Sequence, residues 1–198
     1  MIMKKEHYYE NVLYVKDQVL NKNDNDRIKT VASLMKQGTV LDIGCNTGVI
    51  ASMLARETGS AMYGVALGKK SITYARKRGI RAIYGDAEKK IPFRSSMFDG
   101  CIAISVLEHL FDHHKCIEEI KRVLKPGGYV IIEVPNVGYW VNRFLVLFGK
   151  SLWDSKPNRN IAENQHIRFF TPQVTKQLLE AHGFIVDQCF TKYPQIPL

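Results

Sequence analysis

The chain lacks a CxxC pair, a long apolar run and an apolar segment behind its basic start. Its four cysteines stand apart and mostly in apolar segments, which is typical of reduced core thiols rather than of a disulfide framework or a zinc site; they are Cys45, Cys101, Cys116 and Cys189. No run reaches the roughly 20 apolar residues that cross a bilayer, and "MIMKKEHYYE" is not followed by the core of a signal peptide. We therefore expect a cytoplasmic protein without a membrane span.

Acidic residues are missing from one stretch of the chain. Between Glu57 and Asp86 there is no Asp or Glu, whereas the interval contains several lysines and arginines. In nucleotide-binding α/β folds a carboxylate at the end of the second strand holds the ribose hydroxyls, and here "YGVALGKKS" places Ala66 at that point. The net charge of +9 permits an anionic partner, but the basic residues are spread along the chain, which favours an ordinary solvated surface.

Apolar, β-branched segments alternate with amphipathic helical segments over most of the chain. Strands are expected at 39–45, 61–67, 80–85, 98–106, 129–136 and 184–193. This alternation predicts one α/β domain with a parallel sheet covered by helices on both faces. Within the single domain 1–198 we expect a helical cap (1–37), a cofactor-binding core (38–136), an acceptor-side insertion (137–170), and a final helix and strand (171–198).

The segment "VLDIGCNTGVI" (40–50) carries the main functional pattern. A strand delivers Asp42 to its carboxyl end, and Gly44, Asn46 and Gly48 then shape a tight turn into a helix. Glycines allow a ligand to approach the backbone, and the helix start offers free N–H groups. A carboxylate just before the turn would repel a pyrophosphate and attract an ammonium group. The loop therefore favours a ligand with a cationic end.

Together with this loop, "YGDAEKKIPFRSSMFDGCIAISVLEHL", "RVLKPGGYVIIEVPN", "HIRFFT" and "LLEAHGF" resemble the class I S-adenosylmethionine-dependent methyltransferases, in the small-molecule type 11 and MetW-like group. The resemblance implies a Rossmann-like, mostly parallel seven-stranded sheet with an antiparallel last strand. It implies S-adenosylmethionine as cofactor and S-adenosylhomocysteine as product. It also implies these cofactor-binding residues: Asp42, Gly44, Cys45, Asn46 and Gly48 at the methionine end, Ala66 and Leu67 near the ribose, Asp86 and Ala87 near the adenine, and Ser105 near the sulfonium.

The chain departs from the family pattern at two positions. Asn46 stands where the family often has glycine, which is mild because asparagine tolerates positive φ. Ala66 stands where the family has its ribose carboxylate. Losing a hydrogen bond to a charged group, about 1.5–3 kcal/mol, should weaken cofactor binding roughly ten- to a hundred-fold. Lys69 and Lys70 leave an alternative open, because basic residues here can bind the 2′-phosphate of NADP.

Two histidines are candidates for catalysis. His109 follows the fourth strand at the edge where ligands bind in such sheets, and the resemblance places His166 in the acceptor pocket. Either imidazole could act as a general base or could have a structural role, and Glu108 is expected to orient a neighbour or to cap a helix. The histidines show no HxxxH spacing, so no metal is expected.

The expected acceptor is a small molecule rather than a nucleic acid. The methyltransferases that act on amino groups of bases carry an Asn/Asp-Pro-Pro-Tyr-like motif after the fourth strand, where this chain has "SVLEHL". The chain also has no cluster of aromatic and basic residues on which bases could stack. The apolar segment 137–153 could pack on the domain, cap an acceptor pocket, join two copies as a homodimer or rest on a membrane. In the cap hypothesis the acceptor-binding residues are Tyr9, Trp140, Arg143 and Arg168. The sequence favours an enzyme, a small-molecule O-methyltransferase that uses S-adenosylmethionine. The alternatives are a MetW-like cofactor-binding partner protein and an NADP-dependent reductase.

Overall fold

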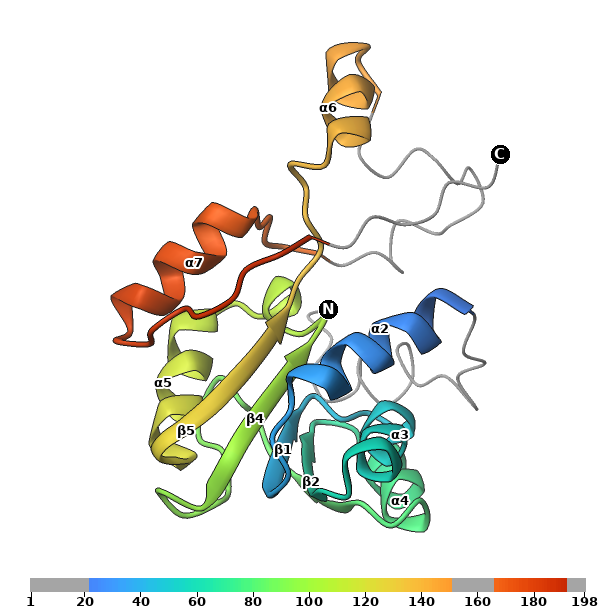
Figure 1. The fold of residues 1–198 in the computed structure, drawn as a ribbon, viewed down its shortest axis with the longest axis vertical. Coiled ribbons are helices and arrows are strands. Elements are labelled where there is room, and N and C mark those ends of the chain that lie inside the picture. The colour runs from blue at the N-terminus through green and yellow to red at the C-terminus, as the bar shows by residue number, and fades with distance from the viewer. Residues whose placement is uncertain (1–21, 151–165, 192–198) are drawn as a thin grey trace, which may run out of the picture.

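The computed structural model describes residues 22–150 and 166–191, and Figure 1 shows a layered α/β arrangement of these residues. The helices are α2 (Lys22–Leu34), α3 (Val49–Thr58), α4 (Lys69–Lys77), the 3₁₀ turn η1 (Leu107–His109), α5 (His113–Val123), α6 (Trp140–Leu147) and α7 (Pro172–Ala181). The strands are β1 (Thr39–Ile43), β2 (Ala61–Ala66), β3 (Arg81–Tyr84), β4 (Phe98–Ile104) and β5 (Leu124–Glu133). The predicted alternation of strands and helices is therefore confirmed.

All five strands are parallel and lie in the order β3-β2-β1-β4-β5. The chain first adds strands on one side of β1 and then crosses to the other side to form β4. The carboxyl ends of β1 and β4 consequently diverge at a switch point, which is where ligands bind in open α/β sheets. Asp42 pairs with Gly64 of β2 and with Ile102 of β4 in the register, so the cofactor loop leaves the sheet at its centre.

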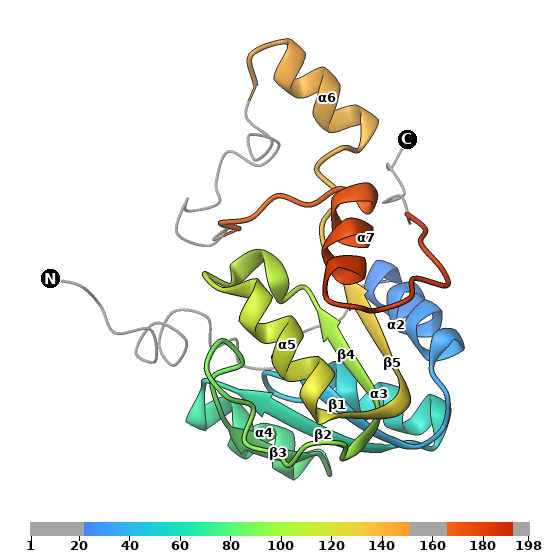
Figure 2. The ribbon, with the colours of Figure 1, turned by 90° about the vertical axis from the view of Figure 1, so that its left-hand side faces the viewer.

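Two apolar cores cover the two faces of the sheet (Figures 1 and 2). One core joins α2, α3 and α4 to the sheet through residues such as Val31, Leu54 and Ile72. The other joins α5 and α7 to the opposite face, with Ile117 and Leu179 among its residues. The predicted helix start at Thr171 is confirmed, since its side chain accepts a hydrogen bond from the Val174 amide and Pro172 occupies the first turn.

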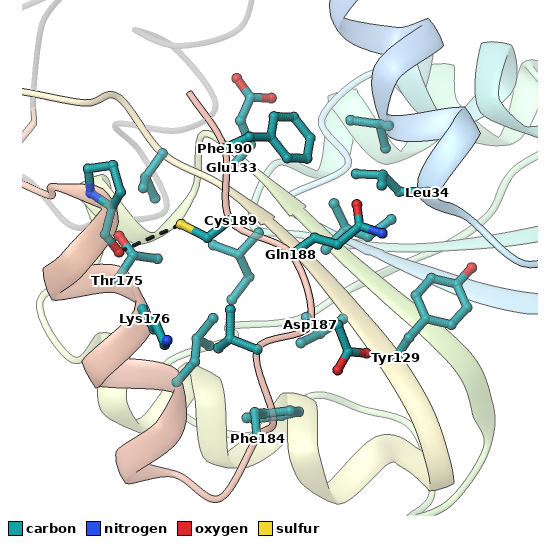
Figure 3. A pocket seen from close by; sticks show the side chains of 18 of the residues that line it. Leu34, Tyr129, Glu133, Thr175, Lys176, Phe184, Asp187, Gln188, Cys189 and Phe190 are labelled. Carbon is teal, nitrogen blue, oxygen red and sulfur yellow. Dashed lines mark hydrogen bonds between the residues drawn. The ribbon is translucent and has the colours of Figure 1, made fainter. Parts of the chain in front are cut away.

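The sheet differs from the expected seven strands with an antiparallel last one, because the described residues contain five strands. Residues 184–191, part of the expected last strand, form no strand and share no backbone hydrogen bond with β5. They run beside β5 across a cavity of about 1360 Å³ that α2 and α7 also line (Figure 3). This separation leaves the outer edge of β5 unpaired among the described residues.

Helix α6 projects away from the sheet (Figures 1 and 2). The segment between β5 and α7 that contains α6 leaves and returns to the domain at the same place. Asn136 and Phe170 form an isolated β-bridge, and the Val137 amide donates to the Phe170 carbonyl at 3.0 Å. None of the α6 residues is buried, and Trp140 and Phe144 are more than half exposed. Among the described helices, none has the length and apolar character needed to cross a membrane.

Candidate functional site

The loop after β1 has the geometry of a ligand-binding turn. Gly44, Asn46 and Gly48 adopt positive φ values of 73°, 45° and 77°. The Gly44 and Cys45 amides donate to the Val65 carbonyl at 2.8 and 3.2 Å, which fixes the loop to the end of β2. Gly48 caps α3 without a side-chain bond, so the first amides of this helix are left to other acceptors. Asn46 thus adopts the positive φ that asparagine tolerates, where the family often has glycine.

Gly44 is required by a close approach between β1 and the end of β4. A Cβ atom at this position would lie 2.8 Å from Cγ2 of Val106, at a φ value that side chains rarely adopt. Val106 immediately follows Ser105, the residue expected near the sulfonium. The turn after β1 and the turn after β4 therefore form neighbouring walls of one site.

Asp42 places a buried carboxyl group at the cofactor loop. Its side chain is 4% exposed, and burial raises the pKa of its carboxyl group to about 8. No neighbouring cation in the described part of the chain offsets this effect. An ammonium group at the mouth of the loop would stabilise the ionised form of Asp42. The carboxylate therefore suits the amino-acid end of S-adenosylmethionine.

The ribose end of the site is formed by the carboxyl ends of β2 and β3. Ala66 pairs with Tyr84 in the register and ends β2, with Leu67 next to it. Asp86 and Ala87 follow β3; the Asp86 carboxylate accepts the Glu88 amide at 3.0 Å, while Ala87 packs against the core. The structure thus places Ala66 where the ribose carboxylate was expected.

Helix α2 contributes a residue that the sequence did not single out. The Arg27 guanidinium bonds Ser105 Oγ at 2.6 Å and Glu133 at the end of β5 at 2.5 Å. Ser105 has a φ of 52°, and its amide donates to the Glu133 carbonyl at 2.9 Å. These bonds fix the turn after β4 from the helical cap. Only the fold reveals this role, since Arg27 is one of many basic residues in the sequence.

His109 and His166 converge on one buried carboxylate, Glu108. Each Nε2 atom lies 3.9 Å from Glu108 Oε1, and the two imidazole centroids are 4.8 Å apart. The Ile167 and Arg168 amides both donate to the Glu108 carbonyl, at 2.9 and 3.2 Å, so backbone bonds hold the two segments together. Burial raises the pKa of Glu108 to about 7, whereas burial and then the His109 charge lower the pKa of His166. At neutral pH His166 is therefore mostly neutral.

The remaining predicted residues take other places. The Cys45 side chain belongs to the core and would meet any Cβ added at Gly64, and its thiol donates to the Asn46 carbonyl at 3.8 Å. Arg168 lies next to the histidines, but its guanidinium bonds the Leu110 and Phe111 carbonyls.

The residues of the expected acceptor cap are not brought to this cluster. Trp140 and Arg143 are on the projecting helix α6, where Arg143 Nε bonds the Gly138 carbonyl at 2.9 Å. Tyr9 lies outside the described residues. The hypothesis that the segment 137–153 caps the acceptor or joins two copies stays a prediction.

Comparisons with known proteins find similar methyltransferases. Residues 41–132 match the family model described as "Methyltransferase domain". A ubiquinone biosynthesis O-methyltransferase from Aeromonas salmonicida is 26% identical over 74% of this chain and 63% of its own length. The O-methyltransferase resE from Aspergillus sclerotiorum is 32% identical over 47% of this chain and 38% of its own length. The chain thus spans less than two thirds of these relatives.

The fold is also that of known methyltransferases. A crystal structure from Thermotoga maritima, described as a SAM-dependent methyltransferase and possible histamine N-methyltransferase, superposes with a TM-score of 0.65. It is 23% identical and covers 82% of this chain and 77% of its own length, which shows the shared fold. The matched segment contains the Asp42 loop and ends near the end of β5. Residues 41–132 are therefore similar to a methyltransferase domain, within a fold that known methyltransferases share.

Proposed function

We propose that the protein transfers the methyl group of S-adenosylmethionine to a hydroxyl oxygen of a small molecule. The observation that carries the proposal is the juxtaposition, at one switch point, of the Asp42 loop and the Glu108, His109 and His166 cluster. The Asp42 loop suits the cofactor, and the cluster of one carboxylate and two imidazoles suits an acceptor that must lose a proton. The O-methyltransferases among the relatives support oxygen as the methylated atom.

For methyl transfer to oxygen, the protein mainly has to position the acceptor hydroxyl against the methyl group and to remove its proton. The cofactor supplies an electrophilic methyl group on a sulfonium, whose product is a neutral thioether. The acceptor oxygen attacks that carbon in line while the carbon–sulfur bond breaks, and holding this geometry can supply roughly 7–11 kcal/mol. Arg27 and Ser105 fix the wall expected beside the sulfonium. A neutral His166 can accept the hydroxyl proton, and Glu108 can stabilise the resulting imidazolium.

The proposal is tested by combining binding and turnover measurements. Calorimetry with S-adenosylhomocysteine and with NADPH separates a methyltransferase-type site from a reductase site. A panel of phenols and aliphatic alcohols, incubated with labelled S-adenosylmethionine, then separates an enzyme from a binding partner protein. Binding of the product with no methyl transfer to any acceptor would favour the MetW-like alternative. NADPH binding without binding of S-adenosylhomocysteine would favour the reductase.

Restoring a carboxylate at the ribose end should strengthen cofactor binding. We expect Ala66→Asp to tighten S-adenosylhomocysteine binding about ten- to a hundred-fold, since a charged hydrogen bond contributes about 1.5–3 kcal/mol. Isothermal calorimetry measures the change. Ala61→Asp is a matched control, because Ala61 is exposed at the opposite end of the same strand. Equal affinities in the wild type and in Ala66→Asp would mean that the ribose lies elsewhere.

The two histidines should affect turnover more than cofactor affinity. We expect His109→Ala and His166→Ala each to lower kcat by about 10²–10⁴, the usual contribution of positioned proton transfer. The dissociation constant of S-adenosylhomocysteine should change little. His182→Ala is the control, since His182 ends α7 and bonds His114 at 3.3 Å rather than Glu108. Normal turnover in both site variants would assign these histidines a structural role.

A further inference from the structure

We propose that Glu108, His109 and His166 bind one divalent transition-metal ion. This site deepens the proposed function, because the ion would lie at the acceptor end of the same pocket. The histidines lack metal-type spacing along the chain, so no metal was expected from the sequence, but such spacing concerns ligands that share one element. Here the ligands come from η1 and from the segment before α7, and the fold brings them together.

The state of Glu108 is the first observation in favour of an ion. Its side chain is 1% exposed, and neither carboxylate oxygen has a hydrogen-bond partner among the described residues. Burying a carboxylate without a partner is costly, and such groups in proteins are paired or coordinate metals. Both imidazoles face this carboxylate at 3.9 Å, beyond hydrogen-bonding distance. A cation among the three side chains would provide the missing interaction.

The second observation is the spacing of the ligand atoms. One ligand atom from each residue can be chosen so that all three lie within 4.8 Å of one another. Ligands bound at about 2.0–2.2 Å to one ion lie roughly 3–3.5 Å apart. Side-chain rotations that move each atom by about 1 Å would therefore close the site. The backbone bonds from Ile167 and Arg168 to the Glu108 carbonyl keep the two segments at the required separation.

The ligand types favour a particular class of ion. Two imidazoles and one carboxylate suit Zn²⁺, Co²⁺, Fe²⁺ or Mn²⁺, whereas Ca²⁺ and Mg²⁺ prefer oxygen ligands. His109 and His166 bind a metal ion as neutral imidazoles, so with Glu108 they would bring a single negative charge to the ion. Three protein ligands leave positions open for water or for an acceptor.

An open position gives the ion a role in methyl transfer. The acceptor hydroxyl would bind the ion and lose its proton to solvent, because coordination lowers the pKa of a bound hydroxyl or water. The resulting oxyanion then forms the new carbon–oxygen bond as the carbon–sulfur bond breaks, with its electron pair remaining on the neutral thioether. In this arrangement the histidines hold the acceptor through the ion rather than accept its proton themselves.

Cobalt binding tests the site directly, without an activity assay. The full untagged chain, treated with EDTA and dialysed, is titrated with Co²⁺ and followed by its visible d–d absorption, with Zn²⁺ calorimetry in parallel. We expect one ion per chain. Glu108→Gln, which keeps the side-chain shape, and His166→Ala should each weaken Co²⁺ binding about tenfold or more.

Two controls keep the measurement specific. His182→Ala removes the exposed His114 and His182 pair and should leave Co²⁺ binding unchanged. A sulfur-to-cobalt charge-transfer band should be absent, because the proposed ligands include no thiol; its presence would indicate binding at Cys189, the exposed cysteine. Absence of binding at millimolar Co²⁺, full binding in folded Glu108→Gln, or loss of binding in His182→Ala would each overturn the metal site.

The two proposals fail in different ways. Methyl transfer that persists in chelator-treated protein without bound Co²⁺ would keep the methyltransferase proposal and overturn the role of the ion. Stoichiometric Co²⁺ binding that depends on Glu108 would support the metal site even if no acceptor were methylated.

Discussion

Asp42→Asn is expected to weaken S-adenosylhomocysteine binding about 30-fold to several thousand-fold at pH 8.5. Removing one partner of a buried, hydrogen-bonded charge pair costs about 2–5 kcal/mol, and each 1.4 kcal/mol is about a factor of ten. Asparagine has nearly the same volume as aspartate, so the loop geometry should persist. Calorimetry measures the affinity. Equal affinities in the two proteins would mean that no ammonium group contacts Asp42.

The wild-type affinity should also depend on pH through the same carboxyl group. The pKa of Asp42 is about 8 in the free protein, so below that pH the group is protonated and must release a proton to pair with an ammonium. Affinity should therefore fall about tenfold for each pH unit from 8 to 6. At pH 6.5, calorimetry in two buffers should detect close to one proton released per ligand. Asp42→Asn should show neither effect.

Folding stability gives an independent check on this pKa. A carboxyl group whose pKa is higher in the folded protein than in the unfolded chain favours folding at low pH and loses that contribution as the pH rises. The free energy of unfolding of the ligand-free wild type should thus fall, relative to Asp42→Asn, between about pH 4 and pH 8. Parallel denaturation profiles of the two proteins over this range would contradict the raised pKa.

The strands and helices of the central sheet could be predicted from the sequence, because their apolar residues recur with the spacing typical of a buried strand or of an amphipathic helix. The buried strand that contains Asp42 and the start of α7 at Thr171 both depend on short-range patterns, and both are confirmed. The last strand depends on long-range pairing with the sheet edge. A segment with strand-forming residues, such as 184–190, cannot by itself reveal whether a neighbouring strand is within hydrogen-bonding distance.

The candidate site was predictable where its residues follow one another along the chain. The turn after β1 has all its parts within a few residues, so its glycines and Asp42 were found together. Arg27 and the grouping of His109 with His166 depend on how distant elements pack. Glu108 was expected to orient a neighbour, but only the fold shows that both imidazoles face its buried carboxylate.

Gly48→Ala is expected to destabilise the whole domain rather than only the cofactor site. From sequence, a side chain at Gly48 would be expected to intrude on the ligand. In the structure a Cβ here would lie 2.9 Å from both Cα and Cβ of Ala75 and 3.2 Å from Ile80, so it meets helix α4. Because a backbone atom is involved, α3 and α4 would have to separate. Overpacking of this kind costs about 1–3 kcal/mol, in addition to about 1–2 kcal/mol for a side chain at positive φ.

Gly79→Ala separates these two contributions. Gly79 has a φ of 82°, close to the 77° of Gly48, but a Cβ there would meet nothing within 4 Å. We expect the control to lose only about 1–2 kcal/mol of unfolding free energy and Gly48→Ala about 2–5 kcal/mol, as measured by urea denaturation. The difference between the variants reports the contact between the cofactor loop and α4. Equal losses of unfolding free energy in the two variants would show that α4 moves to make room for the added methyl group. Close packing against α4 would then not explain why position 48 is glycine.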